Sequence, residues 1–158
     1  MMAKPALTLI LNNIRSAHNV GAIFRTADGA GVDKIYLTGY TPAPVDQFKR
    51  PNSEIAKTAL GAEKTVAWEK RKDVSELIDE LKQENVQIWA LEQDEKSVSY
   101  REVKLTGPAA LIVGNEVEGI SQEILDQCDQ ILEIPMAGVK ESLNVAVATG
   151  VAVFRILG

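Results

Sequence analysis

The last part of the chain reads IPMAGVKESLNVAVATGVAVFRILG, residues 134–158, and joins a polar, turn-rich beginning to an apolar end. Pro135 and Gly138 exclude regular structure at the beginning, whereas residues 142–157 carry apolar side chains at helical spacing. Ser142 or Asn144 can cap this helix, because a short polar side chain accepts hydrogen bonds from the free N–H groups of the first turn. We therefore predict a shaped loop followed by a terminal helix.

Before this stretch, short apolar segments alternate with segments of helical periodicity. Three apolar segments are nearly uninterrupted, which is typical of strands buried on both faces of a parallel sheet: residues 86–92, 109–114 and 130–135. Helices must cover both faces of such a sheet. Residues 73–85 can form one of them, an amphipathic helix that turns Leu77, Ile78 and Leu81 inward.

The remaining segments continue the alternation. Further strands are predicted at residues 6–11, 34–38 and 64–68, and further helices at residues 19–31, 54–60 and 122–128. Ser53 and Ser121 can cap the last two helices, and the prolines of residues 39–53 make this the longest loop. The pattern predicts an α/β fold with a mostly parallel six-stranded sheet and helices on both of its faces.

Composition and cysteine content narrow the class of protein. A chain of 158 residues, 46% hydrophobic and 25% charged, is expected to form one domain over residues 1–158. Cys128 is the only cysteine and His18 the only histidine, so we expect neither a disulfide nor a metal site, and a cytoplasmic location fits best. We expect no signal peptide or membrane span, since Thr149 and Gly150 interrupt the most apolar stretch.

The charge is unevenly distributed along the chain. The net charge is −5, but residues 1–72 hold 11 Lys or Arg against 6 Asp or Glu, whereas residues 73–158 hold 6 against 16. The acidic total argues weakly against a nucleic-acid partner. A basic surface on the first half nevertheless stays compatible with one.

Ligands of parallel sheets bind beyond the carboxyl ends of the strands, and two candidate loops lie there. In GNEVEGIS, residues 114–121, two glycines allow a ligand to approach the backbone closely, although a tight turn would also use them. In residues 134–144, Ser142 and Asn144 stand at a helix start, where polar ligands bind, although both could simply be caps. Residues 114–121 lack the Gly-Lys-Ser/Thr ending of a Walker loop, and residues 28–34, DGAGVDK, are a poor Rossmann fingerprint because they follow a helix and precede a strand.

A third candidate lies in NNIRSAHNVGAIFRTADGAG, residues 12–31. Asn19 and Arg25 could face one cleft from the start of the predicted helix. Arg25 could equally extend its charged end into solvent or pair with Asp28. His18 reads as an exposed loop residue rather than a base, because no carboxylate partner is visible in the sequence.

Together these stretches resemble the three motifs of the SpoU (TrmH-like) RNA ribose 2′-O-methyltransferases of the SPOUT superfamily, over nearly the whole chain. The first motif matches Asn19, Gly21, Arg25 and Thr26, and the second matches Gly114, Asn115, Glu116 and Gly119. The third matches Ile134, Pro135, Met136, Gly138, Ser142, Leu143, Asn144 and Val145. Three ordered motifs are more specific than any one alone. Two departures are Ala146, where many members have serine, and the lack of a flanking domain.

The resemblance implies a trefoil knot made by the C-terminal stretch, which would explain its shaped loop. It implies S-adenosylmethionine as cofactor and S-adenosylhomocysteine as product. The expected cofactor-binding residues are Leu91, Gly114, Asn115, Gly119, Ile134, Met136, Ser142 and Leu143.

The resemblance also implies a set of catalytic residues: Asn19, Arg25, Glu116, Ser142 and Asn144. A ribose 2′-hydroxyl would attack the sulfonium methyl group, with no need for a metal, and Arg25 would be the base that takes its proton. Because arginine is almost always protonated, we favour another role, in which Arg25 holds the adjacent phosphate and stabilises the developing alkoxide. Glu116 would then anchor Arg25.

The implied partners are RNA and a second copy of the chain. Expected RNA contacts are Arg15, Arg25, Lys49 and Arg50, and a homodimer is expected through the first and last helices, where Ala146, Ala148, Gly150 and Ala152 permit close packing. The substrate could be tRNA or rRNA, with no separate RNA-binding domain in the chain. Two alternatives stay open: an RNA-associated scaffold that binds the cofactor without methyl transfer, and a SPOUT enzyme that methylates a base.

Overall fold

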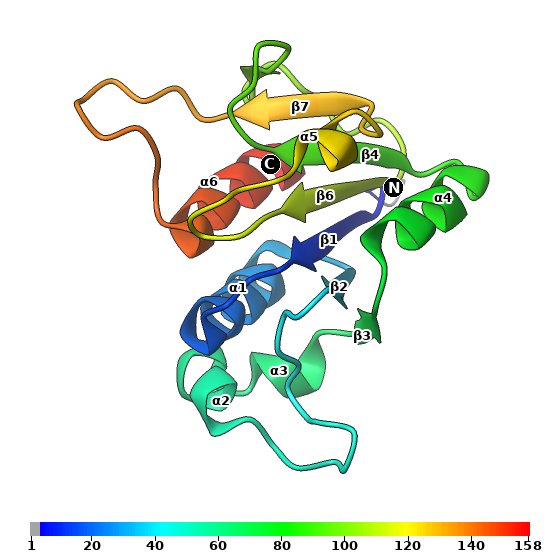
Figure 1. Cartoon of the computed structure of the whole chain (residues 1–158), viewed down its shortest axis with the longest axis vertical. Helices are drawn as coiled ribbons and strands as arrows, with labels where there is room; N and C mark the ends of the chain where they lie inside the picture. The colour runs from blue at the N-terminus through cyan, green and yellow to red at the C-terminus, as the bar shows by residue number, and fades with distance from the viewer. Residues whose placement is uncertain (1–3) are drawn as a thin grey trace.

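Seven parallel strands form one sheet in the computed structural model, which describes residues 4–158 (Figure 1). The strands are β1 (Leu7–Asn12), β2 (Lys34–Thr38), β3 (Trp68–Arg71), β4 (Gln87–Leu91), β5 (Val98–Ser99), β6 (Ala109–Val113) and β7 (Gln130–Glu133). Their order across the sheet is β3-β2-β1-β6-β4-β7-β5. The predicted α/β class and parallel sheet are confirmed. The prediction of six strands missed β5, which has only two residues and pairs with β7 at the sheet edge.

Helices cover both faces of the sheet, and each face has its own hydrophobic core. The helices are α1 (Ala17–Ala30), α2 (Ser53–Ala59), α3 (Ala62–Thr65), α4 (Val74–Gln83), α5 (Gln122–Leu125) and α6 (Val145–Leu157). Leu9 and Leu11 of β1 pack with side chains of α1, α2, α3 and α6, whereas Ile10 packs with those of α4 and α5. This alternation is the period of two that a strand imposes on its side chains. The layers therefore follow directly from the apolar strands.

The strand predicted at residues 64–68 is wrong. Lys64 and Thr65 end α3, where the backbone N–H of Val66 donates to the Ala62 carbonyl at 3.0 Å, and β3 begins only at Trp68. The β-branched side chains of Thr65 and Val66 favoured a strand, but Val66 is buried in the core beneath α1. Packing outweighed local propensity here.

Four predicted helix starts shift by one to three residues, among them those of α2 and α6. Asn52, not Ser53, caps α2, because its side-chain oxygen accepts from the backbone N–H groups of Glu54 and Ile55. The terminal helix begins at Val145 rather than at residue 142, and Asn144 caps it. Ser121 caps α5 as predicted, and Gly31 ends α1 in the left-handed conformation. The passage of the chain through a knot stays a prediction.

A candidate active site at the carboxyl ends of the strands

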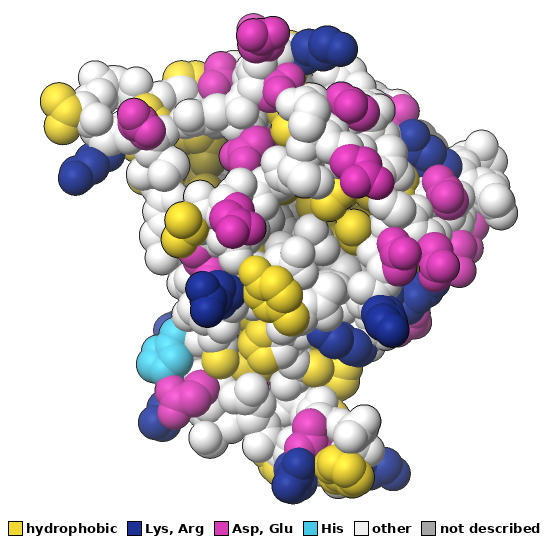
Figure 2. Space-filling model, in the orientation of Figure 1, with side chains coloured by type: hydrophobic (Ala, Val, Ile, Leu, Met, Phe, Trp, Pro, Cys, Tyr) yellow, Lys and Arg dark blue, Asp and Glu magenta, His cyan; other side chains and the backbone are white. Residues whose placement is uncertain are grey.

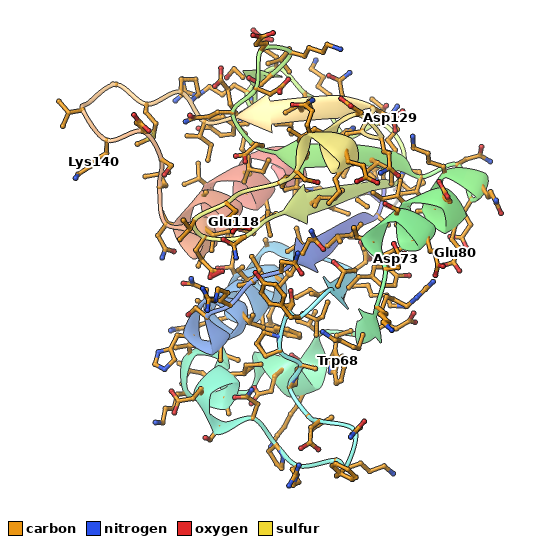
Figure 3. The ribbon with its side chains drawn as sticks, in the orientation of Figure 1. Trp68, Asp73, Glu80, Glu118, Asp129 and Lys140 are labelled. Carbon is orange, nitrogen blue, oxygen red and sulfur yellow. The ribbon has the colours of Figure 1, made fainter. Side chains whose placement is uncertain are left out.

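One pocket lies where β4, β6 and β7 end and α6 begins. All eight residues predicted to hold a cofactor line it: Leu91, Gly114, Asn115, Gly119, Ile134, Met136, Ser142 and Leu143. They reach it from three strand ends and from residues 134–144, which project from the body of the protein and carry Lys140 outward (Figures 1 and 3). The carboxyl ends of neighbouring parallel strands meet at one edge, which is why residues so distant in sequence converge.

Glu92 also lines the pocket, and its role was not visible in the sequence. Its Oε1 atom accepts from the backbone N–H of Ile120 at 3.0 Å. Gly119 has a φ of 68°, and a Cβ atom on it would lie 2.0 Å from that same Oε1 atom. Glycine is therefore required at position 119 for two reasons: its backbone is left-handed, and the Glu92 carboxylate leaves no room for a Cβ atom. The glycine was predicted, but the partner that explains it was not.

Asn115 holds the 114–119 loop in shape through its side chain. Its Oδ1 atom accepts from the backbone N–H groups of Val117 and Glu118, both at 2.8 Å. Its Nδ2 atom donates to the Asn13 carbonyl at 3.0 Å and to the Tyr40 hydroxyl at 2.9 Å. Because the Asn115 side chain is buried and both of its polar atoms are hydrogen-bonded, it shapes the pocket wall.

Glu116 joins the same loop to the beginning of α1. Its carboxylate accepts from the backbone N–H of Arg15 at 2.9 Å and from that of Ser16 at 3.3 Å. We expected Glu116 to anchor the guanidinium of Arg25; within the described residues 4–158 its carboxylate instead holds these backbone N–H groups, and the anchoring of Arg25 stays a prediction. The N–H groups that precede a helix need an acceptor, and the carboxylate supplies one.

Asn19 and Asn144 meet across the site, and Arg25 is exposed. The Asn144 Nδ2 atom lies 3.3 Å from the Asn19 Oδ1 atom, so the first and third motifs are in contact. Over residues 4–158, no hydrogen bond or ion pair engages the Arg25 guanidinium, and Asp28 instead accepts from the Thr65 hydroxyl at 3.2 Å. Arg25 does not line the pocket, although its charge is free to meet a ligand.

His18 is exposed, as predicted, but it is not a loop residue and it does have a carboxylate partner. His18 lies within α1, and its ring contacts the Glu54 carboxylate of α2. Hydrogen bonds from His18 and Lys57 lower the pKa of Glu54. The sequence separation of His18 and Glu54 concealed the pair, since only the packing of α1 on α2 brings them together.

The two predicted RNA contacts in the long loop lie at its turn. Asp46 accepts from the Arg50 Nε atom at 2.7 Å, and hydrogen bonds from Arg50 lower the pKa of Asp46. Lys49 occupies the same turn with a φ of 62°. Neither residue lines the pocket, and a role for them in RNA binding stays a prediction.

The pocket is acidic. Four carboxylates line it, Glu92, Glu116, Glu118 and Glu133, and the described lining residues include no lysine or arginine. Figure 3 shows Glu118 near the strand ends at this edge of the sheet. Leu91, Ile134 and Leu143 add apolar lining. This combination suits a ligand with an apolar ring system and a positive charge.

Residues 4–158 contain neither a membrane-spanning helix nor a cluster of metal-binding side chains. No helix there is long and apolar enough to cross a membrane. Nor do three histidine, cysteine, aspartate or glutamate side chains gather there in an arrangement that could hold a metal ion.

Comparison with known proteins places this geometry in context. Residues 6–154 match the SpoU rRNA Methylase family. The 23S rRNA (guanosine-2′-O-)-methyltransferase RlmB of Haemophilus influenzae is 39% identical over 152 residues, which cover 96% of this chain and 59% of that protein. RlmB of Escherichia coli K12 is 35% identical over 147 residues, which cover 93% of this chain and 58% of that protein. The chain thus spans less than two thirds of the length of these relatives.

Solved structures show the same architecture. The A. aeolicus TrmH/SpoU tRNA modifying enzyme superposes with a TM-score of 0.84 at 34% identity, covering 98% of this chain and 75% of that one. The AdoMet-bound rRNA methyltransferase from Sinorhizobium meliloti superposes with a TM-score of 0.85 at 29% identity, covering 97% of this chain and 56% of that one. The latter protein binds its cofactor within a fold like this one.

Proposed function

Because the chain belongs to the SpoU rRNA methylase family, we propose that it transfers the methyl group of S-adenosylmethionine to a ribose 2′-hydroxyl of ribosomal RNA. One observation carries the proposal: all eight residues expected to hold the cofactor line one pocket. The names of the RlmB relatives favour rRNA over tRNA as substrate. In this proposal residues 1–158 form the catalytic domain, its C-terminal stretch is knotted, and it acts in the cytoplasm.

The chemistry of the pocket suits this cofactor. When bound, S-adenosylmethionine supplies an electrophilic methyl group on a positively charged sulfur. Leu91, Ile134 and Leu143 offer apolar contacts for its adenine, and the four lining carboxylates favour its positive charge. S-adenosylhomocysteine lacks the sulfonium charge. The same carboxylates therefore favour the substrate form of the cofactor over its product.

The catalytic residues would work on the RNA rather than on the cofactor. Arg25 is exposed and its guanidinium has no hydrogen-bond partner within the described structure, so it can hold a phosphate and stabilise the ribose 2′-oxygen. This oxygen would form a bond to the methyl carbon as the bond from carbon to sulfur breaks, and its proton would pass to solvent water. The contact between Asn144 and Asn19 places two amides where they can orient the ribose. Ser142 lines the pocket beside them. Positioning and charge then supply the catalysis.

A homodimer through α1 and α6 belongs to the same proposal. Val147, Val151 and Phe154 are exposed at successive turns of α6 and form an apolar stripe. Gly150 faces Thr26 of α1 within the same chain, so small residues serve the internal packing of these helices. The larger apolar side chains are left for a second copy, and Arg25 on α1 would reach toward the partner's cofactor.

The test of function is methyl transfer from labelled cofactor to rRNA and tRNA, followed by alkaline digestion. A 2′-O-methyl group blocks alkaline cleavage, so ribose methylation leaves label in alkali-resistant dinucleotides. Arg25→Ala should abolish this signal, whereas Arg101→Ala, another exposed arginine, should retain it. Label in mononucleotides would indicate a methylated base, and cofactor binding without transfer would favour an RNA-associated scaffold.

A further inference from the structure

Tyr40 is an exposed aromatic residue beside the pocket. It follows β2 and is 56% exposed. Its hydroxyl accepts a hydrogen bond from the Asn115 Nδ2 atom at 2.9 Å. Asn115 belongs to the 114–119 loop that forms the pocket wall. The polar end of the ring is therefore tied to the pocket, while much of the ring remains open to solvent.

The backbone around Tyr40 is held from both sides. Its N–H donates to the Asn13 Oδ1 atom at 3.2 Å. The Lys70 ammonium donates to the Gly39 carbonyl at 2.8 Å and also to the Thr41 carbonyl, the residues on either side of Tyr40. Gly39 has a φ of 61°, and a Cβ atom on it would lie 1.8 Å from the Asn13 Oδ1 atom. Such bracing fixes the ring before any ligand arrives.

Positive charge lies on both sides of this segment. Arg15 is exposed two residues after Asn13, and its own N–H is fixed by Glu116. Lys72 accepts from the Gly39 N–H through its carbonyl at 3.3 Å and lines a second cavity with Asn13 and Gly39. On the face drawn in Figure 2, hydrophobic side chains gather near the middle with lysine or arginine side chains on either side.

An exposed aromatic ring between cations is the arrangement with which proteins hold single-stranded nucleic acid, because bases stack on the ring and phosphates meet the charges. We propose that Tyr40 is the platform on which a base of the RNA substrate stacks beside the cofactor pocket, with Arg15 and Lys72 facing the flanking phosphates. This inference rests on the proposed function and adds a positioning residue to it. The hydrogen bond to Asn115 does not require the ring of Tyr40 to be exposed, so the exposure of the ring points to a second role.

The test compares two replacements of Tyr40. Tyr40→Phe keeps the ring and removes the hydroxyl, whereas Tyr40→Leu keeps an apolar side chain and removes the ring. Each protein is titrated with short single-stranded oligoadenylate and with an abasic ribose-phosphate strand of equal length and charge. Isothermal titration with S-adenosylmethionine and methyl transfer to rRNA are measured on the same preparations.

Stacking predicts that wild type binds oligoadenylate roughly tenfold or more tightly than the abasic strand. Tyr40→Leu should lose this preference, whereas Tyr40→Phe should keep it, and the two variants should have equal abasic and cofactor affinities because both lack the hydroxyl that binds Asn115. If wild type and Tyr40→Leu bind oligoadenylate equally well, the stacking role of Tyr40 is refuted. Methyl transfer by the same preparations would still support the proposed function. Equal losses in both variants would show that only the hydroxyl matters. Wild type that neither binds RNA nor transfers methyl would overturn the function and the platform together.

Discussion

Replacing Gly119 by alanine perturbs the pocket wall at one defined contact. The new Cβ atom would lie 2.0 Å from the Glu92 Oε1 atom, so the carboxylate must move and release the N–H of Ile120. Gly31→Ala is the matched control. Gly31 also has a positive φ, 86° against 68° for Gly119, but a Cβ atom there meets nothing within 4 Å.

The two substitutions share one free-energy cost and differ in another. A non-glycine residue in the left-handed region costs about 1 kcal/mol in each variant. Gly119→Ala also loses a hydrogen bond to a charged acceptor, worth about 1 to 2 kcal/mol once the partial exposure of Glu92 is allowed for. We expect the free energy of unfolding to fall by about 1 kcal/mol for Gly31→Ala and by about 2 to 3 kcal/mol for Gly119→Ala.

Urea unfolding measures the stabilities, and isothermal titration measures the affinity for S-adenosylmethionine. Only Gly119→Ala should weaken that affinity, by roughly tenfold, because only it displaces a lining residue. Glu92→Ala should partly relieve the clash. The loss of unfolding free energy in the variant that carries both Gly119→Ala and Glu92→Ala should therefore be smaller than the sum of the two single losses. Equal stability losses at Gly31 and Gly119, with unchanged cofactor affinity, would refute this account of the wall.

Three further outcomes follow from single contacts. Burial raises the pKa of the Cys128 thiol to about 11 from 9.0, so its alkylation at pH 8 should be about 100-fold slower than in the urea-unfolded chain. Mass spectrometry measures the rate of alkylation. Asn144→Ala should lower the free energy of unfolding by about 1 kcal/mol and Asn144→Asp should not, since aspartate keeps the cap of α6. Burial lowers the pKa of Lys70, so the folded protein binds this proton less tightly than the unfolded chain. Wild type should therefore gain stability relative to Lys70→Met as the pH rises toward 10.5.

Much of the architecture was predictable from the sequence because the apolar strands are long and uninterrupted. The segments around Leu9, Ile88 and Leu111 have no other stable position than between two helical layers. The two-residue strand β5 carries no such pattern, since pairing with β7 alone defines it. The strand predicted at residues 64–68 was wrong for the opposite reason: their β-branched residues indicated a strand, whereas packing in the core places Val66 at the end of a helix.

The sequence predicted which loops form the site, but it did not predict the contacts between their residues. Gly114 and Gly119 are expected wherever the backbone turns tightly near a ligand. The residues that contact these glycines follow other strands, as Glu92 follows β4. No local sequence pattern connects positions that only the sheet brings together, so these contacts could not be predicted. Tyr40 was missed similarly, because its partner Asn115 lies on a distant loop.

The strand order has a consequence for the way the chain acquires its structure. β1 pairs with β6, so that Leu7 lies opposite Ala109, and the lining of the pocket includes four residues that follow all seven strands: Ser142, Leu143, Val145 and Ala148. Contacts between such distant positions give the fold a high contact order, which slows folding. During synthesis on a ribosome, β1 must wait for β6, its partner at the centre of the sheet, and the pocket is complete only once residue 148 has emerged. A nascent chain therefore forms this pocket only after all seven strands have emerged.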